Sequence, residues 1–346
     1  MEVAIITDQH FGMRKGSQIF HDYMAKFYNE VFFPLLDKHN TKIVLDLGDT
    51  FDNRKSIDFW SLQWAKENYY DKLQERGITV YTVIGNHTSY YKNTLNINAI
   101  NLLLNEYPNV IQIDKPQTLN IGGLDVCFVP WICVDNETET FEEINNTKAK
   151  VCMGHLELSG FEAHPGYVMD HGMSHEVFGK FKAVFSGHFH HMSQASNIYY
   201  LGNPYQMYWN DYGDTRGFHF FDTEKVRLTY IKNPFNMFEK IFYNDQTTDY
   251  SQIDESQYKD KFIKLIVEKK TNYYEFDLFV ERLYQIGIHE LKIIDNSHHE
   301  IESSGDLEVE GTISFLEKYV EEIDYEDKDN LKNIINSIYV ESLQVE

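Results

Sequence analysis

The sequence has 346 residues, with 31 Lys and Arg against 54 Asp and Glu, so its formal net charge is −23. At roughly 150 residues per domain, this length predicts two domains. Hydrophobic residues make up 42% of the chain and aromatic residues 15%, which excludes a disordered or low-complexity protein. The charge argues against holding nucleic acid or anionic lipid by bulk electrostatics alone, but not against a nucleic-acid enzyme with bound metal ions.

The cysteines and the N-terminus indicate the cellular compartment in which we expect the protein. The chain has an odd number of cysteines, at positions 127, 133 and 152, and no pair has CxxC spacing. This predicts reduced thiols in a cytosolic protein. The N-terminus starts as a strand without the basic flank of a signal peptide, and no apolar run approaches the ~20 residues of a membrane span. We therefore expect a soluble, cytoplasmic protein with no membrane partner.

Short apolar runs alternate with longer amphipathic ones in the first two thirds of the chain. Strands are predicted at 3–7, 43–47 and 79–84, with helices between them at 20–39 and 57–76, the second ending at Gly77. This alternation predicts a largely parallel sheet. Later strands follow one another with fewer helices, at 110–113, 124–129, 150–153, 183–185, 198–201, 217–221 and 226–231. We therefore expect a two-sheet α/β sandwich rather than an open nucleotide-binding sheet.

The segment at 233–236, Asn-Pro-Phe-Asn, predicts a domain boundary. The first domain would span 1–232. A small α+β domain at 233–303 would contain strands at 261–267 and 290–294 with a helix at 274–286 between them. A tail at 304–346 would form two amphipathic helices, at 312–323 and 329–343, separated by an acidic turn.

Polar residues gather at the ends of five predicted strands, in the order DxH, GDxxD, GNH, GH and GHxH. Because ligands in α/β proteins collect at the carboxyl ends of strands, we expect these motifs to meet at one place. Taken singly, each has an ordinary explanation such as a helix N-cap or a turn. The joint order favours a metal site built from Asp8, His10, Asp49, Asn86, His155, His188 and His190.

The chemistry of this set predicts a two-metal centre. Two carboxylates, one amide and four imidazoles suit Mn²⁺ or Fe²⁺, and suit a closed structural Zn²⁺ site less well. Seven ligands are too many for one ion with open positions, so one carboxylate should bridge two ions. Ions ~3.5–4 Å apart can activate water and hold the attacking and leaving oxygens of a phosphate ester. The glycine before each ligand motif would let the chain turn sharply where its strand ends.

The five motifs, in this order, resemble the calcineurin-like metallophosphoesterase superfamily. The segments 48–55, 154–161 and 186–190, with Tyr91-Lys92-Asn93 and Pro130-Trp131, are similar to SbcD-type double-strand-break repair nucleases. Within that family they look most like the small subunits of recombination endonucleases from T-even-like phages, which would place the chain in a host cytoplasm. The resemblance covers residues 1–230 by specific motifs and the remainder by layout only.

The resemblance implies roles for single residues. Asp8, His10 and His190 would hold the first ion, and Asn86, His155 and His188 the second, with Asp49 bridging them. The cofactor would be two divalent ions, manganese first, with magnesium or iron as alternatives. His87 would face the scissile phosphate and protonate the leaving oxygen, as suits an imidazole near neutral pH.

One departure from the family pattern concerns His87. The family motif GNHD reads Gly-Asn-His-Thr at positions 85–88, so Thr88 stands where a carboxylate would orient the imidazole. Either another carboxylate, with Asp52 as the candidate, takes over this role, or the orientation and basicity of His87 are less well set.

Five basic residues follow the strand-end motifs and could hold DNA phosphates, or could be ordinary solvated side chains: Arg14, Lys15, Arg54, Lys55 and Lys92.

The family therefore implies a DNA exonuclease or endonuclease for double-strand-break repair and recombination-dependent replication. It would act as a homodimer within a heterotetramer, together with an SbcC-like coiled-coil ATPase. The domain at 233–303 would cap the site and select DNA, and the tail would bind the ATPase. Residues 295–346 carry 15 acidic and 3 basic residues, a net charge of −12, which suits a segment meant for a protein partner.

Two alternatives remain open. A metallophosphatase acting on phosphoprotein or small phosphoesters usually has Asp-Arg-Gly at its second carboxylate, where this chain has Asp52 followed by Asn-Arg-Lys. A non-catalytic scaffold of the same complex is suggested only by Thr88. The sequence leaves open the polarity of degradation, the physiological metal and any requirement for ATP hydrolysis.

Overall fold

The computed structural model describes residues 1–295, 328 and 331–332. They fall into two compact units: residues 1–207 with 213–235 form the first, while the second contains 208–212 and resumes at 236. Apart from positions 331 and 332, the tail helices predicted at 312–323 and 329–343 lie outside the described residues. No helix in the described part is long and apolar enough to cross a bilayer.

The first unit contains two six-stranded sheets. The first sheet has the order β14-β13-β1-β2-β3-β4, in which β1 to β4 are parallel and β13 and β14 are antiparallel neighbours. Its strands are β1 (Glu2–Ile6), β2 (Ile43–Asp46), β3 (Thr79–Val83), β4 (Val110–Ile113), β13 (Gly217–Asp222) and β14 (Arg227–Lys232).

The second sheet has the order β11-β12-β10-β7-β6-β5, with a parallel centre and an antiparallel strand at each edge. Its strands are β5 (Gln117–Ile121), β6 (Leu124–Val129), β7 (Val151–His155), β10 (Ala183–Gly187), β11 (Ser193–Ala195) and β12 (Ile198–Tyr200). The predicted α/β sandwich is confirmed. The antiparallel edge strands β5 and β11 were missed because both are short and largely polar.

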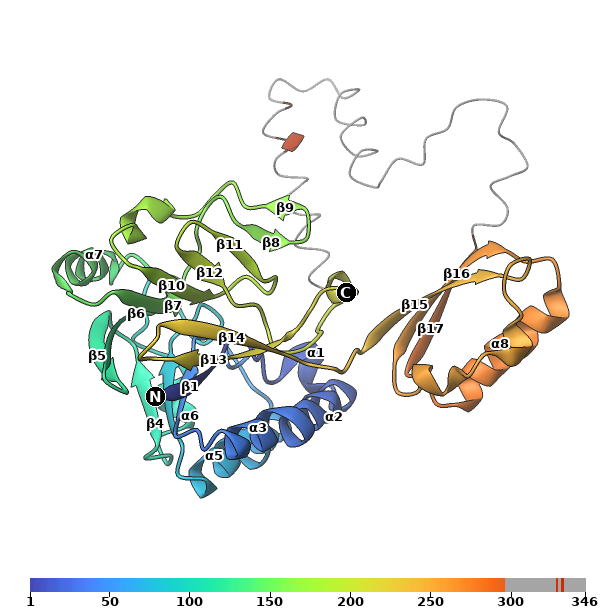
Figure 1. The fold of residues 1–346 in the computed structure, drawn as a ribbon, viewed down its shortest axis with the longest axis horizontal. Helices are drawn as coiled ribbons and strands as arrows, with labels where there is room; N and C mark the ends of the chain where they lie inside the picture. Colours follow the sequence, from blue (N-terminus) through green and yellow to red (C-terminus); the bar gives the residue numbers. More distant parts are fainter. Residues whose placement is uncertain (296–327, 329–330, 333–346) are drawn as a thin grey trace. The chain divides into compact units, whose positions relative to one another are not determined.

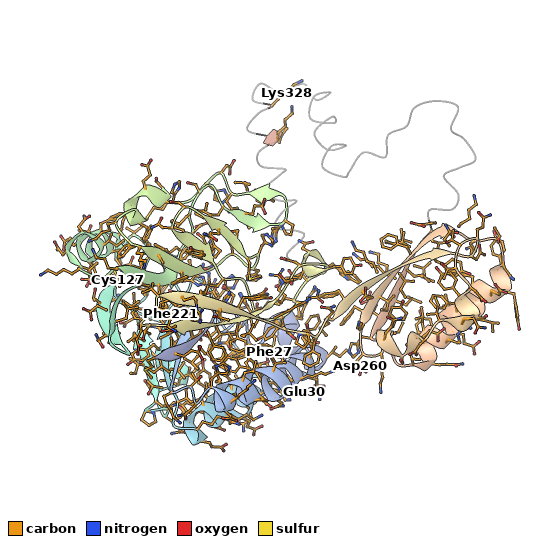
Figure 2. All side chains as sticks on the ribbon, in the orientation of Figure 1. Phe27, Glu30, Cys127, Phe221, Asp260 and Lys328 are labelled. Carbon is orange, nitrogen blue, oxygen red and sulfur yellow. The ribbon has the colours of Figure 1, made fainter. Side chains whose placement is uncertain are left out.

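The core lies between the two sheets. Val3, Leu45 and Phe221 of the first sheet pack with Phe128 and Phe185 of the second in one buried cluster. Figure 1 shows the strands of both sheets, and Figure 2 labels Phe221 among the side chains. The outer face of the second sheet is covered by α7 (Glu137–Asn146) and the turn His175–Phe178, whose cluster includes Cys127 and Cys152. All three cysteines are free and buried.

Two long helices cover the outer face of the first sheet. Each predicted long helix is interrupted in the middle by a π-helical segment, at Tyr28–Phe32 and Lys66–Tyr70. The flanking helices are α2 (Gln18–Phe27), α3 (Phe33–Lys38), α4 (Phe59–Ala65) and α5 (Asp71–Glu75). The wider turn places Tyr28, Tyr69 and Tyr70 fully inside the aromatic layer beneath the strand-end loops.

The remaining elements of the first unit are short. They are α1 (Met13–Gly16), α6 (Ala99–Leu103) and a hairpin of β8 (Glu162–His164) and β9 (Tyr167–Val168). The described residues of the second unit include the parallel sheet β15-β16-β17 and the helix α8. Its elements are β15 (Phe238–Asn244), β16 (Phe262–Lys269), α8 (Tyr273–Gln285) and β17 (Glu290–Asp295). Phe276, Phe279 and Leu283 of α8 form a separate core with the sheet.

Candidate metal centre

The loops after β1 and β2 continue the pairing of their strands. Asp8 N donates to Gly48 O at 2.9 Å, His10 N to Asp49 O at 3.0 Å, and Phe11 N to Thr50 O at 2.8 Å. These bonds hold two ligand-bearing loops side by side beyond the regular sheet. The side chains they carry are therefore fixed by backbone contacts before any ligand binds.

Four of the seven predicted ligands have a left-handed backbone. The φ angle is 53° at Asp8, 49° at His10, 52° at Asp49 and 89° at His188. A residue with a Cβ adopts such a conformation at a cost of about 1–3 kcal/mol, and such residues cluster at functional sites. The sharp turns at the strand ends are therefore made by the ligands themselves.

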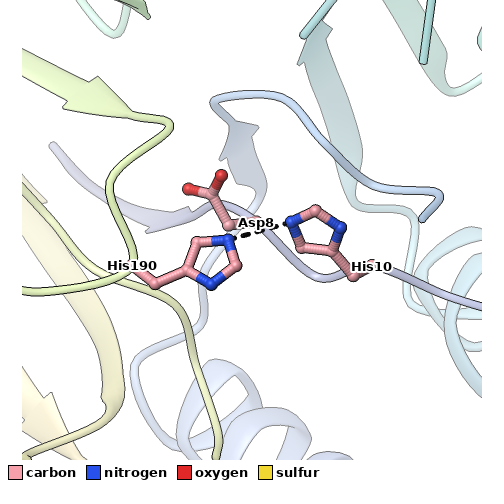
Figure 3. Close-up of side chains that lie close together, drawn as sticks. All are labelled: Asp8, His10 and His190. Atoms are coloured by element: carbon pink, nitrogen blue, oxygen red, sulfur yellow. Dashed lines mark hydrogen bonds between the residues drawn. The ribbon is translucent and has the colours of Figure 1, made fainter. Parts of the chain in front are cut away.

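The first group of candidate ligands is Asp8, His10 and His190. The Nε2 atoms of His10 and His190 face each other at 3.1 Å, with Asp8 beside them (Figure 3). One donor atom from each of the three residues lies within 4.8 Å of the others. The Asp8 carboxylate is held by the Thr7 hydroxyl at 2.7 Å and by the backbone N–H of His188 at 3.1 Å.

The second group is Asp49, His155 and His188, joined by Asn86. His155 Nε2 lies 3.1 Å from Asp49 Oδ2 and 2.9 Å from Asn86 Oδ1, which also lies 3.1 Å from His188 Nδ1. His155 Nδ1 donates to the carbonyl of Leu47 at 2.8 Å. In the neutral imidazole this bond keeps the proton on Nδ1, so that Nε2 is the nitrogen with a lone pair for a cation.

Both groups fit divalent cations. Two imidazole nitrogens that approach to 3.1 Å can share one proton or a metal ion, and nearby carboxylates favour the cation. The donors are nitrogen and oxygen only, as Mn²⁺ and Fe²⁺ prefer. The structure thus brings all seven predicted residues together, as two sets from five strand ends.

The glycines that precede the ligands serve mainly to make room. Only Gly48 has a positive φ, of 106°, and a Cβ there would also lie 2.5 Å from Nδ1 of His155. Glycines 85, 154 and 187 have no such φ, so the expectation that each glycine permits a sharp turn is wrong for them. A Cβ at Gly85 would overlap the Asp49 carboxylate, and one at Gly187 would overlap Thr7.

Burial and charge move the pKa values of these groups in opposite directions. Burial would raise the pKa of Asp49, but the charges of His155 and His87 hold it well below its usual range. Burial would lower the pKa of His155, but the charge of Asp49 and its hydrogen bond raise it to about 9. Burial, with the positive charge of His155, lowers the pKa of His188 to about 3. A proton on His155 thus offsets the negative charge of Asp49, as a bound cation would.

His87 lies beside the first group with its orientation set by two contacts. Its backbone N–H donates to Asp49 Oδ1 at 2.7 Å, and its Nδ1 donates to the main-chain carbonyl of Asp52 at 2.5 Å. The carboxylate of Asp52 instead lies 3.2 Å from Nδ1 of His10. Asp52 thus reaches His87 through its backbone, whereas the expected substitute was a carboxylate.

Thr88 closes the turn that carries Asn86 and His87. Its hydroxyl accepts from Gly85 N at 3.0 Å and donates to Gly85 O at 3.1 Å, and the side chain is fully buried. These bonds occupy the hydroxyl within its own turn.

The five basic candidates differ in their surroundings. Arg54 is half-buried, and its buried Nη1 has no hydrogen-bond partner among the described residues. Burial lowers the pKa of Arg54 in spite of the nearby charge of Asp49. Arg14 contacts the carbonyl of Met207 at 3.5 Å. The other three side chains are exposed: Lys15, Lys55 and Lys92.

Three further residues line or support the site without having been predicted. The Trp131 ring lies 5.2 Å from the His188 ring, and Glu157 lies 4.0 Å from Nε2 of His188. Buried Asp46 accepts hydrogen bonds from Gln9, Gly48 and Thr50, and so ties the first two loops together. The signal for Asp46 was a carboxylate inside an otherwise apolar strand.

Comparison with known proteins gives matches along most of the chain. The calcineurin-like phosphoesterase family matches residues 1–192, which include every residue of both groups. Exonuclease subunit 1 of Enterobacteria phage T4 is 32% identical over 356 residues, covering 99% of this chain and all of that protein. The solved structure of an archaeal phosphodiesterase, 12% identical, covers 67% of this chain and all of its own, with a TM-score of 0.35.

Proposed function

The chain belongs to the calcineurin-like phosphoesterase family, and from that premise we propose that it is a two-metal nuclease that hydrolyses DNA phosphodiester bonds. One observation carries the proposal: five strand ends bring two groups of nitrogen and oxygen donors to one edge of the sandwich. The exonuclease name of the phage T4 relative supports DNA as the substrate.

In this proposal Asp8, His10 and His190 bind one ion, Asn86, His155 and His188 bind the other, and Asp49 bridges them. Two bound divalent ions, manganese first and magnesium or iron as alternatives, would supply an activated water and positive charge for the phosphate. Asp49 also accepts from the backbone of His87 at 2.7 Å, so one carboxylate couples the ion sites to the imidazole.

His87 is the proposed general acid. Because its Nδ1 donates to the Asp52 carbonyl, Nε2 is the atom left to face a substrate and move a proton. Arg54, with a buried guanidinium nitrogen near Asp49, is the basic candidate best placed for a phosphate oxygen. We propose that Arg14, Lys15, Lys55 and Lys92 contact DNA farther from the scissile bond.

A Mn²⁺-dependent assay on DNA, run beside a phosphomonoester substrate, tests this function. We expect DNA cleavage by the wild type, loss of cleavage and of Mn²⁺ binding in Asp49→Asn, and about a 10²–10⁴-fold lower rate in His87→Ala. Asp135→Asn and His39→Ala, at surface positions, serve as controls matched in chemistry. Phosphomonoester hydrolysis without DNA cleavage would establish a phosphatase, and binding of Mn²⁺ without either activity would establish a scaffold.

We also propose that the chain works with an SbcC-like coiled-coil ATPase, in double-strand-break repair and recombination-dependent replication. The word subunit in the name of the phage T4 relative supports a complex, and the net charge of −12 over residues 295–346 supports a protein-binding tail. The capping role of 233–303, the ATPase-binding role of 304–346 and a homodimer within a heterotetramer belong to the same proposal. Copurification of the full chain with such an ATPase, compared with a chain ending at 303, tests it.

A further inference from the structure

The loop that follows β10 carries two of the proposed ligands, His188 and His190, without regular secondary structure. Its backbone is held at the carbonyl of His190, which accepts from the N–H of Asn203 at 3.2 Å and from the guanidinium of Arg216. The Arg216 side chain is only 3% exposed. A charged donor from a distant part of the chain therefore fixes the peptide unit that carries a ligand.

Asp214 completes this arrangement. Its Oδ2 lies 3.1 Å from Nη2 of Arg216 and 2.7 Å from Nδ1 of His191, which is the residue after the ligand. The carboxylate is 8% exposed. Arg216 and Asp214 thus contact the loop at two consecutive residues, His190 and His191. Both lie in the segment that leads into β13.

The opposite side of His191 is closed by the β8–β9 hairpin. Nε2 of His191 lies 3.4 Å from the carboxylate of Glu162 on β8. His191 therefore lies between two carboxylates, those of Asp214 and Glu162. Its ring acts as a spacer between the hairpin and the Arg216–Asp214 pair.

A buried ion pair gives little net stability, because the loss of hydration cancels much of the attraction. The pair is better explained by geometry. Arginine offers several N–H donors in a rigid plane, so one side chain can hold a carboxylate and a carbonyl at once. Lysine can keep the charge but cannot reproduce that fixed fork.

We propose that Arg216 and Asp214 are positioning residues that hold His190, and with it the first metal group, in its binding geometry. The proposal rests on the proposed role of His190 as a metal ligand. Neither residue is close enough in sequence to the ligand motifs to belong to them. Their contacts with the loop are made at the carbonyl of His190 and at the ring of His191.

Direct titration of the full-length protein with Mn²⁺ tests the proposal. Partners that orient metal ligands typically contribute about 10–100-fold to affinity, so we expect Arg216→Met and Asp214→Asn to raise the Mn²⁺ dissociation constant by that factor. Arg216→Lys keeps the positive charge of the ion pair but loses the planar set of N–H donors. Its Mn²⁺ dissociation constant should lie between those of these variants and the wild type. At saturating Mn²⁺, kcat should return to within a few-fold of wild type, with KM for DNA unchanged.

Arg227→Met is the matched control, since Arg227 is exposed on the hairpin of β13 and β14. If Arg216→Met fails to fold, His191→Gln, at a position 17% exposed, tests the contact of Asp214 with the same loop. It should weaken Mn²⁺ binding less than Arg216→Met does. Folded variants with unchanged Mn²⁺ affinity, or with a kcat that excess Mn²⁺ does not restore, would overturn the inference alone. Failure of the wild type to bind Mn²⁺ would overturn the proposed function as well.

Discussion

Asp46→Asn gives a sharp test of how the site is supported. Asp46 is fully buried at the end of β2, and its carboxylate accepts from Gln9 Nε2 at 3.1 Å, Thr50 Oγ1 at 2.6 Å and Gly48 N at 3.2 Å. Burial raises its pKa from 3.8 to about 7, although these hydrogen bonds oppose the rise. The folded protein therefore holds a proton on Asp46 that the unfolded chain releases at lower pH.

The sign and size of the effect follow from proton linkage. Between pH 4 and pH 7 the folded state binds one more proton than the unfolded state, so the contribution of Asp46 to stability falls as pH rises. The slope is about 1.4 kcal/mol per pH unit near pH 5 and falls to about half of that at pH 7, which gives about 2 kcal/mol between pH 5 and pH 7. Asparagine does not titrate and avoids this loss. Relative to wild type, Asp46→Asn should therefore gain about 2 kcal/mol in stability over that interval.

Urea unfolding of both proteins at pH 5, 6, 7 and 8, with chelator present, measures the difference. The absolute effect of the substitution at pH 5 depends on how the amide fits the three donors, but its change with pH does not. Asp135→Asn, on the surface, controls for the altered net charge. A difference between Asp46→Asn and wild type that stays constant from pH 5 to pH 8 would refute a protonated, buried Asp46.

Three other predictions follow from the site. Mn²⁺ affinity should rise with pH up to about 9, because the proton on His155 must leave before its nitrogen binds, and calorimetry in buffers of different ionisation enthalpy should detect its release. Gly85→Ala should abolish Mn²⁺ binding, since its methyl group would overlap the Asp49 carboxylate, whereas Gly123→Ala, with no atom within 4 Å, should keep it. Thr88→Asp should lower stability by about 1–3 kcal/mol by facing a carboxylate to the Gly85 carbonyl, and an unchanged unfolding midpoint would contradict this.

The grouping of the candidate ligands could be predicted because its signal is local. Each follows an apolar strand directly, and parallel strands must bring their carboxyl ends to one edge, so Asp8, Asn86 and His188 could be placed without coordinates. Strand positions were predictable for the same reason, from short β-branched runs. The missed strand β15 precedes β16 in parallel register, but Glu239 and Lys240 interrupt its apolar pattern.

What supports the ligands could not be predicted, because it depends on contacts between residues far apart in the sequence. Arg216 reaches back 26 residues to the His190 carbonyl, and Tyr205 donates to the carbonyl of Gln9 at 2.6 Å across 196 residues. The π-helical segments were missed as well, because the helices predicted at 20–39 and 57–76 follow a single 3.6-residue period throughout. Asp52 shows the same limit. A sequence motif identifies a residue by its side chain, whereas the contact with Nδ1 of His87 is made by the main-chain carbonyl of Asp52.

The acidic charge of the chain has two separate physical meanings. Residues 1–230 carry 28 acidic and 19 basic residues, and two divalent cations would offset nearly half of that excess at the one place where a phosphate must approach. Within the site, burial and the nearby charge of Asp49 raise the pKa of Asp8, the hydrogen bond and charge of Asp52 raise the pKa of His10, and the charge of Asp49 raises the pKa of His155 to about 9. Cations and protons therefore compete for the same carboxylates and imidazoles. In the proposed nuclease, metal ions would therefore bind best at neutral to alkaline pH, where His155 gives up its proton at least cost, and the bound cations would attract the DNA phosphates.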